Sequence, residues 1–376
     1  MPKFTETELA DLVDQEQIVG LTLDTTEFFH VGYDYEKPSF KALGQFAGSN
    51  TAVVFSEVVL REVQADVGDD IASKTELIRS GLKQLNKAAR LGLDAKALID
   101  GLGLPESFER AKELLDAFVA GIGAATIGVD AGPSVRALTD LYFTFEPPFS
   151  KKAEKKNEFP DAIALLSLEY WAKEKGGFVL AVSSDGDWKR FADRSEHVVH
   201  MPRLAAALNL FNGDNAVVAN RLAANLAAKT AMRLADRIND TLAGVVETFD
   251  VDANAPYFYE VDDEHAEITG WTLANDQFDV LAADDDSVTV AITLTVEATF
   301  YAAFTFEVRD SIDRDYVSIG GTRAATEETF QSVVVVTVGR DDDSPDPDIL
   351  EIEVEGPSIS ADFGYVEVDY GDDREA

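Results

Sequence analysis

Acidic residues lie where apolar stretches of the sequence begin or end. Asp24 closes the run IVGLTLD, and Asp185 follows the run FVLAVSS. Asp161 opens a long apolar helical stretch directly after Pro160. Because functional groups of open parallel sheets gather at the carboxyl ends of the strands, we expect these carboxylates to meet at one edge of a sheet.

Two glutamates and one more aspartate extend this set. Glu57 and Glu62 both follow the run TAVVF, and their spacing leaves open which of them joins the others; Asp187 stands two residues after Asp185. A cluster of unneutralised carboxylates raises its own pKa values by repulsion, whereas Mg²⁺ or Mn²⁺ favours the ionised state and accepts oxygen ligands. The residues alone therefore predict a metal-dependent hydrolase that activates water.

Each acid also has a structural interpretation. Asp161 can interact with the dipole at the start of its helix, and Asp185 or Asp187 can cap the helix that follows. Taken singly, each residue favours the structural role. The coincidence of several acids at one sheet edge favours the metal site.

The composition of the chain limits the number of domains, the partners and the chemistry that can be expected. A chain of 376 residues that is 46% hydrophobic can bury two cores, so we expect two domains. The formal charge of -38 repels polyanions at long range and counts against nucleic acid as a partner. The absence of cysteine excludes disulfides, thiolate metal sites and cysteine catalysis.

The sequence shows no sign of a membrane segment. It begins MPKFTETELADLV, without the basic and apolar regions of a secretory signal, so a cytoplasmic location is expected. The apolar stretch 287–308 alternates between Val, Ile, Leu or Phe and Thr or Glu. This period of two predicts one very long strand, or two with a bend, and no contact with a membrane is expected.

The first part of the chain predicts an α/β domain over residues 1–214. Strand candidates at 18–24, 52–55, 177–185 and 197–201 alternate with helical stretches, which is typical of a parallel sheet flanked by helices. The interval 74–141 is mostly helical in pattern and predicts an insertion or lid. Leucines and isoleucines at helical spacing over 215–249 predict one long helix that connects two domains.

Residues 250–376 predict a second, acidic domain. From Val251 onward 32 acidic residues stand against five arginines, a net charge of -27, which leaves -11 for the preceding part. Short alternating runs separated by Asp, Gly and Pro predict an antiparallel β-sheet, and the acidic turns are interpreted as solvated loops.

Four motifs resemble those of the PIN-domain nucleases, in particular the larger bacterial PIN-like proteins with a helical insertion. They are LTLDTTEF, FSEVVLREV, PPFSKKAEKKNEFPDAIALLSL and VSSDGDWKRF, and together they cover about residues 18–201 in the family's order. Thr26 stands where Asn is common, and Ser56 where Pro is common. The resemblance implies Asp24, Glu62 rather than Glu57, Asp161 and Asp185 as metal ligands, with Asp187 as a fifth ligand or a water-positioning group.

The resemblance also implies an activity. Such proteins are Mg²⁺- or Mn²⁺-dependent phosphodiesterases, usually endoribonucleases, in which water is the nucleophile and no covalent intermediate forms; RNA is favoured over DNA. Basic residues near the acids could hold substrate phosphate. These are Lys151, Lys152, Lys155 and Lys156 before Asp161, and Lys189 and Arg190 after Asp187.

Two other functions stay open at this point. The first is a non-catalytic PIN-like scaffold that acts through protein–protein binding, and the second is a phosphatase for small phosphoesters. The acidic second domain could recruit a basic protein or guard the site. The residues say nothing of the oligomeric state.

Overall fold

The computed structural model describes residues 4–90, 92, 94–101, 106–130, 132, 134–149, 158–275, 278–309, 316–340, 342, 344–356 and 359–369. By its internal contacts the chain divides into two compact units, Met1–Phe211 and Asn212–Ala376. The helices that lead up to residue 249 thus fall within the second unit.

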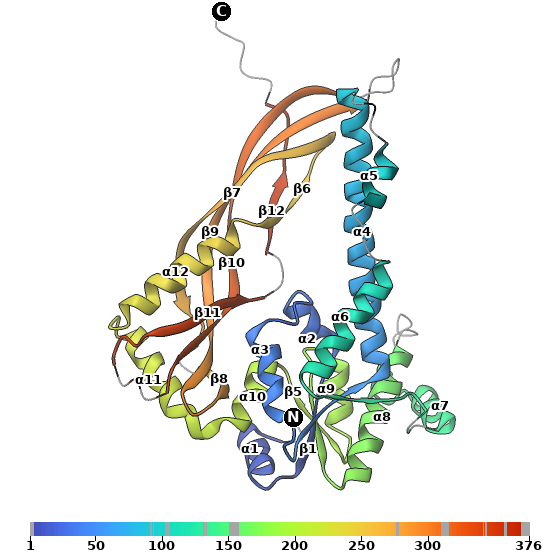
Figure 1. The fold of residues 1–376 in the computed structure, drawn as a ribbon, viewed down its shortest axis with the longest axis vertical. Coiled ribbons are helices and arrows are strands. Elements are labelled where there is room, and N and C mark those ends of the chain that lie inside the picture. Colours follow the sequence, from blue (N-terminus) through green and yellow to red (C-terminus); the bar gives the residue numbers. More distant parts are fainter. Residues whose placement is uncertain are drawn as a thin grey trace, which may run out of the picture. The chain divides into compact units, whose positions relative to one another are not determined.

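The first unit alternates strands and helices (Figure 1). In chain order its elements are α1 (Glu6–Asp14), β1 (Ile18–Leu23), α2 (Thr25–His30), α3 (Pro38–Lys41), the 3-10 turn η1 (Ala42–Phe46), β2 (Ala52–Ser56), α4 (Glu57–Ala89), α5 (Ala95–Gly101), α6 (Ser107–Gly121), β3 (Ala125–Ile127), α7 (Val135–Thr144), α8 (Phe159–Lys175), β4 (Phe178–Val182), α9 (Gly186–Ala192), β5 (Val198–Met201) and α10 (Leu204–Phe211).

The five strands of this unit form one parallel sheet in the order β3-β2-β1-β4-β5. Helices lie on both sides of it, which confirms the predicted α/β class (Figure 1). Leu23 at the end of β1 pairs with Val182 at the end of β4. The residues that follow these two strands, Asp24 and Ser183, are therefore neighbours at the same edge.

Helix α8 crosses the sheet and contacts all five strands. It lies close to β1 because Gly20 has no side chain: a Cβ atom there would stand 2.6 Å from a ring carbon of Trp171. Pro160 occupies the first turn of α8, where its missing N–H costs no helical hydrogen bond. The close approach of α8 fixes the position of Asp161 relative to the ends of β1 and β4.

Helix α4 begins at the end of β2, where the Ser56 side chain accepts a hydrogen bond from the backbone N–H of Val58. Its buried side chains, Val59, Val63 and Val67, lie in the first three turns, where α6 packs against it. The segment 74–141, expected to be mostly helical, also contains β3 at the sheet edge. Three residues are too few to show the period of a strand, so the sequence pattern misses β3.

The second unit places two helices before a set of strands (Figure 1). Its elements are η3 (Gly213–Asn215), α11 (Ala216–Ala227), α12 (Met232–Val246), β6 (Phe249–Asn254), β7 (Phe258–Leu273), β8 (Asp279–Ala283), β9 (Ser287–Arg309), β10 (Tyr316–Gly339), β11 (Ile349–Glu355) and β12 (Ile359–Tyr365).

Strand β9 is the centre of this unit. It pairs in antiparallel fashion with β10 along its whole length and with β7 and β8 on its other edge, which confirms the predicted antiparallel sheet. One face of β9 is buried from Val288 to Phe306, as the alternation predicts. Helices α11 and α12 cover the first part of this face, and the parallel pair β6–β12 covers the rest.

Two expectations for this part of the chain are wrong. The single connecting helix over 215–249 is two helices, because the chain turns at Lys229, whose φ of 57° lies in the left-handed region. The turn lets both helices pack against one sheet, with α11 on β8 and α12 on β7 and β11. Runs expected as short strands also form longer ones, since β7 has 16 residues and β10 has 24. Strand β9, with 23 residues, is the single very long strand that the alternation allowed.

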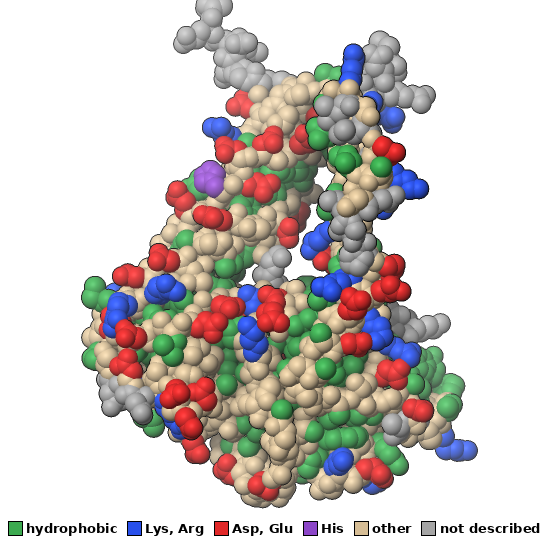
Figure 2. Space-filling model, viewed as in Figure 1, with side chains coloured by type: hydrophobic (Ala, Val, Ile, Leu, Met, Phe, Trp, Pro, Cys, Tyr) green, Lys and Arg blue, Asp and Glu red, His purple; other side chains and the backbone are tan. Residues whose placement is uncertain are grey.

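The acidic residues of the second unit are spread over its surface. On the face shown in Figure 2, acidic side chains are scattered along the strands rather than gathered in one patch. The acidic turn before β11 is tied to α12, since the Arg233 Nε donates to Asp346 at 3.2 Å and its Nη1 pairs with Asp348. Over the part of the chain that the structure describes, no helix is long and apolar enough to span a bilayer.

Candidate functional site

Asp24 lies at the carboxyl end of β1 and is 4% exposed. Its Oδ1 accepts a hydrogen bond from the backbone N–H of Thr25 at 2.7 Å, and its Oδ2 accepts from the hydroxyls of Thr26 at 3.0 Å and Ser183 at 2.7 Å. Burial raises the pKa of Asp24, while these three donors oppose the rise. Since an ionised carboxylate accepts about four hydrogen bonds, one acceptor position is left for a further ligand.

The two candidate glutamates of α4 have different partners. Glu62 accepts a hydrogen bond from the Thr25 hydroxyl at 3.2 Å, so it lies beside Asp24. Burial and the charge of Asp24 raise the pKa of Glu62. Glu57 instead accepts from the backbone N–H of Val129 at 3.2 Å and pairs with Arg61. The structure thus brings Glu62, and not Glu57, to Asp24.

Asp161 opens α8 at the same edge of the sheet. Its Oδ1 accepts a hydrogen bond from the indole Nε1–H of Trp188 at 3.0 Å, and Trp188 itself is fully buried. Burial raises the pKa of Asp161 to about 6, and the negative charges of Asp24, Glu62 and Asp185 add to the rise. Negative charge from three neighbouring carboxylates therefore acts on Asp161.

Asp185 and Asp187 share one turn and have different partners. Asp185 caps α9, where its Oδ1 accepts from the backbone N–H of Asp187 at 2.7 Å. Its own backbone N–H donates to the Ser183 hydroxyl at 2.9 Å, so the same serine holds Asp24 and Asp185. Asp187 is buried and forms an ion pair with Arg190.

The basic residues predicted to hold phosphate are only partly described. Lys151, Lys152, Lys155 and Lys156 lie outside the described residues. Lys189 pairs with Asp193 at 2.6 Å, and Arg190 pairs with Asp187. Each of these two side chains is therefore already paired with a carboxylate, and a substrate phosphate would compete with that carboxylate for the positive charge.

The four carboxylates at this edge have the chemistry of a site for a divalent cation. Asp24, Glu62, Asp161 and Asp185 offer only carboxylate oxygens, which suit Mg²⁺ or Mn²⁺, and the charges of the other three all act on Asp161. Within the described ranges, no three acidic or histidine side chains converge closely enough to hold one metal ion as they stand. The chemistry of the site fits a cation, and binding one requires some of these side chains to turn toward it.

Four residues that position the acids were not predicted with these roles. Thr25 links Asp24 to Glu62, Thr26 and Ser183 donate to Asp24, and Trp188 donates to Asp161. All four lie within the motifs that contain Asp24 and Asp185, and this proximity in sequence could have indicated that they contact the acids. Their hydrogen bonds depend on how the strands align, and a single sequence does not give that alignment.

A comparison with protein families gives a match within the first unit. Residues 21–188 match the family model described as PIN domain. The matched segment begins in β1 and ends in α9, so it contains Asp24, Glu62, Asp161 and Asp185. Neither the curated proteins nor the solved structures gave a match to the chain.

Proposed function

We propose that the chain, whose residues 21–188 match the PIN-domain family, is a Mg²⁺- or Mn²⁺-dependent phosphodiesterase that cleaves RNA by attack of water. The observation that carries the proposal is that Asp161, a partly buried carboxylate, lies within reach of the charges of three other carboxylates. Buried like charges are costly, and a divalent cation is the partner that would offset that cost.

The proposed ligands are Asp24, Glu62, Asp161 and Asp185. When bound, the cation would lower the pKa of a water molecule and stabilise the charge that develops on the phosphate. The chain's part is to hold the carboxylates: Ser183 fixes Asp24 and Asp185, and Trp188 fixes Asp161. Asp187, paired with Arg190, is proposed to orient water or the α9 turn rather than to bind the cation.

RNA is proposed as the substrate in spite of the overall charge. The first unit carries the smaller share of the negative charge, since most of it follows Val251. Screening at physiological salt limits long-range repulsion to about 8 Å. The proposed role of the acidic second unit is to bind a basic protein partner. Cleavage by the full chain and by a chain ending at Phe211 would test whether that unit also guards the site, and equal rates would exclude a guard.

The cleavage assay compares wild type with Asp161→Asn on a labelled single-stranded RNA with Mn²⁺, Mg²⁺ or EDTA. Asn keeps an oxygen to accept the Trp188 hydrogen bond and removes the charge. We expect cleavage by wild type with metal and at least about 100-fold less by Asp161→Asn. Asp342→Asn in the second unit is the matched control and should cleave at the wild-type rate.

The assay also separates the other candidate functions. A phosphatase would hydrolyse a generic phosphomonoester and leave RNA intact. A non-catalytic scaffold would cleave neither substrate with any metal, and wild type and Asp161→Asn would then be equally inactive. Either result would refute the proposed nuclease activity.

A further inference from the structure

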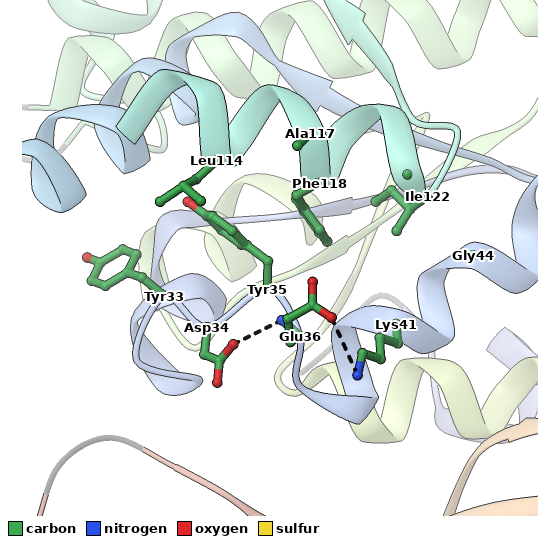
Figure 3. Close-up of a pocket in the computed structure, with 11 residues that line it drawn as sticks. Tyr33, Asp34, Tyr35, Glu36, Lys41, Gly44, Leu114, Ala117, Phe118 and Ile122 are labelled. Carbon is green, nitrogen blue, oxygen red and sulfur yellow. Dashed lines mark hydrogen bonds and ion pairs between the residues drawn. The ribbon is translucent and has the colours of Figure 1, made fainter. Parts of the chain in front are cut away.

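A cavity of about 490 Å³ lies in the first unit between α6 and the segment from Tyr33 to Lys41 (Figure 3). This volume is within the range of small-molecule sites, roughly 300 to 1,000 Å³. Leu114, Ala117 and Phe118 of α6 form one side, and Tyr33 and Tyr35 lie opposite them (Figure 3). None of these residues has a role in the carboxylate site described above.

The aromatic part of the wall is rigid. The rings of Tyr35 and Phe118 stack with centroids 5.0 Å apart and planes 16° apart. Phe28 and Phe40, both fully buried, pack against the Phe118 ring at centroid distances of 6.1 and 5.3 Å. These contacts hold the apolar wall in place, so a ligand meets a surface that is already ordered.

The Tyr35 hydroxyl is buried in this wall without a hydrogen-bond partner among the described residues. Burial raises its pKa, so the hydroxyl keeps its proton at neutral pH. A buried hydroxyl without a partner costs free energy, which a ligand that exchanges a hydrogen bond with it would recover. The residue thus favours a ligand that is both flat and polar at its edge.

The mouth of the cavity offers acceptors. Asp34 uses Oδ1 to accept from the backbone N–H of Glu36 at 3.0 Å, and Glu36 uses Oε2 to pair with Lys41 at 3.5 Å (Figure 3). The second oxygen of each carboxylate can accept another hydrogen bond. A ligand with an amino group on a flat ring complements these oxygens.

The cavity adjoins the carboxylate site through Tyr33. The Tyr33 hydroxyl donates to Asp66 at 2.9 Å, and Asp66 lies one helical turn after Glu62 on the same face of α4. On the other side, the Tyr33 ring meets that of Phe29, which is 56% exposed and lies on α2, the helix that Asp24 caps. Aromatic surface therefore runs from the helix of Asp24 to the cavity.

We propose that this cavity is a nucleobase subsite, which binds a base of the nucleic-acid substrate beside the phosphate that is cleaved. The inference rests on the proposed nuclease function. It selects bases with an exocyclic amino group, adenine, cytosine or guanine, over uracil. A cage for an organic cation fits less well, because the stacked faces of Tyr35 and Phe118 cover each other and Lys41 lies at the mouth.

The test measures binding of the four ribonucleosides to the full chain in EDTA, where no cleavage occurs, by saturation-transfer NMR. Ala117→Trp fills the cavity from an exposed position, and Ala120→Trp places the same ring at an exposed position of α6 that does not line the cavity. Tyr35→Phe removes the hydroxyl and keeps the ring. We expect adenosine, cytidine and guanosine to bind wild type and Ala120→Trp, Ala117→Trp to lose binding at least about tenfold, and Tyr35→Phe to lose about fivefold.

Each outcome decides the proposal. Equal binding to wild type and Ala117→Trp, or binding of tetramethylammonium in place of nucleosides, would overturn it. Nucleoside binding that Ala117→Trp removes would support it even if wild type cleaves no RNA, and only the proposed nuclease function would then fail. Cleavage without nucleoside binding would leave the nuclease function and overturn the subsite.

Discussion

The two units of this protein use carboxylates in opposite ways. In the first unit, burial raises the pKa values of Asp24, Glu62 and Asp161. In the second, Asp284 and Asp342 have lowered pKa values, because backbone N–H groups of their own turns donate to them. The second unit carries more negative charge, and yet the carboxylates whose pKa values burial raises lie in the first.

This difference shows that the surroundings of acidic residues indicate a cation site better than the number of acidic residues does. A carboxylate in a turn is satisfied by water and by nearby N–H groups, and it needs no cation. A carboxylate at a buried sheet edge loses water and gains like-charged neighbours. The first arrangement keeps a surface solvated. In the second, the negative charges repel one another, and a bound divalent cation would reduce that repulsion.

The largest effect is expected within α4 itself. Glu62→Gln should lower metal-dependent RNA cleavage at least about 100-fold, because it removes a charge next to Asp24. Glu57→Gln, five residues earlier in the same helix, should change the rate less than about threefold, since Glu57 contacts Val129 and Arg61. Equal losses in the two variants would contradict the assignment of Glu62.

A second expected effect is on stability without metal. The pKa of Asp161 is about 6 in the folded chain against an ordinary value of 3.8, so the folded state holds the proton more tightly. The contribution of this group to stability is therefore fully present below pH 3.8 and is lost as the pH rises through 6. Asp161→Asn should be more stable than wild type by about 2 to 3 kcal/mol at pH 7.5 and no more stable at pH 3.8.

Urea unfolding in EDTA checks this prediction. A Trp271→Phe background leaves Trp171 and Trp188, both in the first unit, as the fluorescent reporters. The quantity measured is the difference in the free energy of unfolding between Asp161→Asn and its parent as a function of pH. A difference that stays constant from pH 3.8 to 7.5 would show that Asp161 is not perturbed.

A somewhat smaller effect is expected where α8 meets β1. Gly20→Ala should destabilise the first unit by about 1 to 3 kcal/mol, because its Cβ would overlap the Trp171 ring and force α8 outward. Gly81→Ala, in an exposed turn of α4 with open space around it, should stabilise that helix by about 1 kcal/mol. Opposite signs in the same urea assay would confirm the close packing, and two stabilising substitutions would refute it.

The smallest effect is expected in the second unit. Arg233→Gln removes the ion pairs to Asp346 and Asp348, which lie at the surface. Surface pairs contribute little and are screened by salt. The melting temperature should fall slightly at low salt and not at 1 M NaCl. A large decrease in melting temperature that persists in 1 M NaCl would contradict this prediction and show that the contacts of Arg233 with the acidic turn are essential to the stability of the unit.

Much of the first unit could be predicted from the sequence. The strands β1, β2, β4 and β5 are apolar runs, and a parallel sheet puts the residues after them at one edge, so Asp24, Asp161 and Asp185 were expected together. The choice of Glu62 over Glu57 needed the resemblance of its motif to the family's. Glu62 stays a predicted ligand, and its contact with Thr25, which spans 37 residues of sequence, places it beside Asp24.

The other features of the structure depend on contacts between residues far apart in the chain, and a local sequence pattern does not predict such contacts. Strand β3 is too short to show a period, and the turn at Lys229 follows from how α11 and α12 pack on one sheet. The cavity beside Tyr35 requires α6 to lie against the segment after α2, residues that are about 80 apart in the chain. Alternation predicted the buried face of β9, but not how far its neighbours extend.

Calorimetric titration with Mn²⁺ tests the difference between the two units most directly. Wild type at pH 7.5 should bind Mn²⁺ at one site, and at pH 5.0 about tenfold more weakly, because a carboxyl group with a pKa of about 6 is then mostly protonated. Asp161→Asn should lose the site, and Asp342→Asn should keep it. Unchanged Mn²⁺ affinity in Asp161→Asn, or loss of the site in Asp342→Asn, would contradict the assignment of the cation to the first unit.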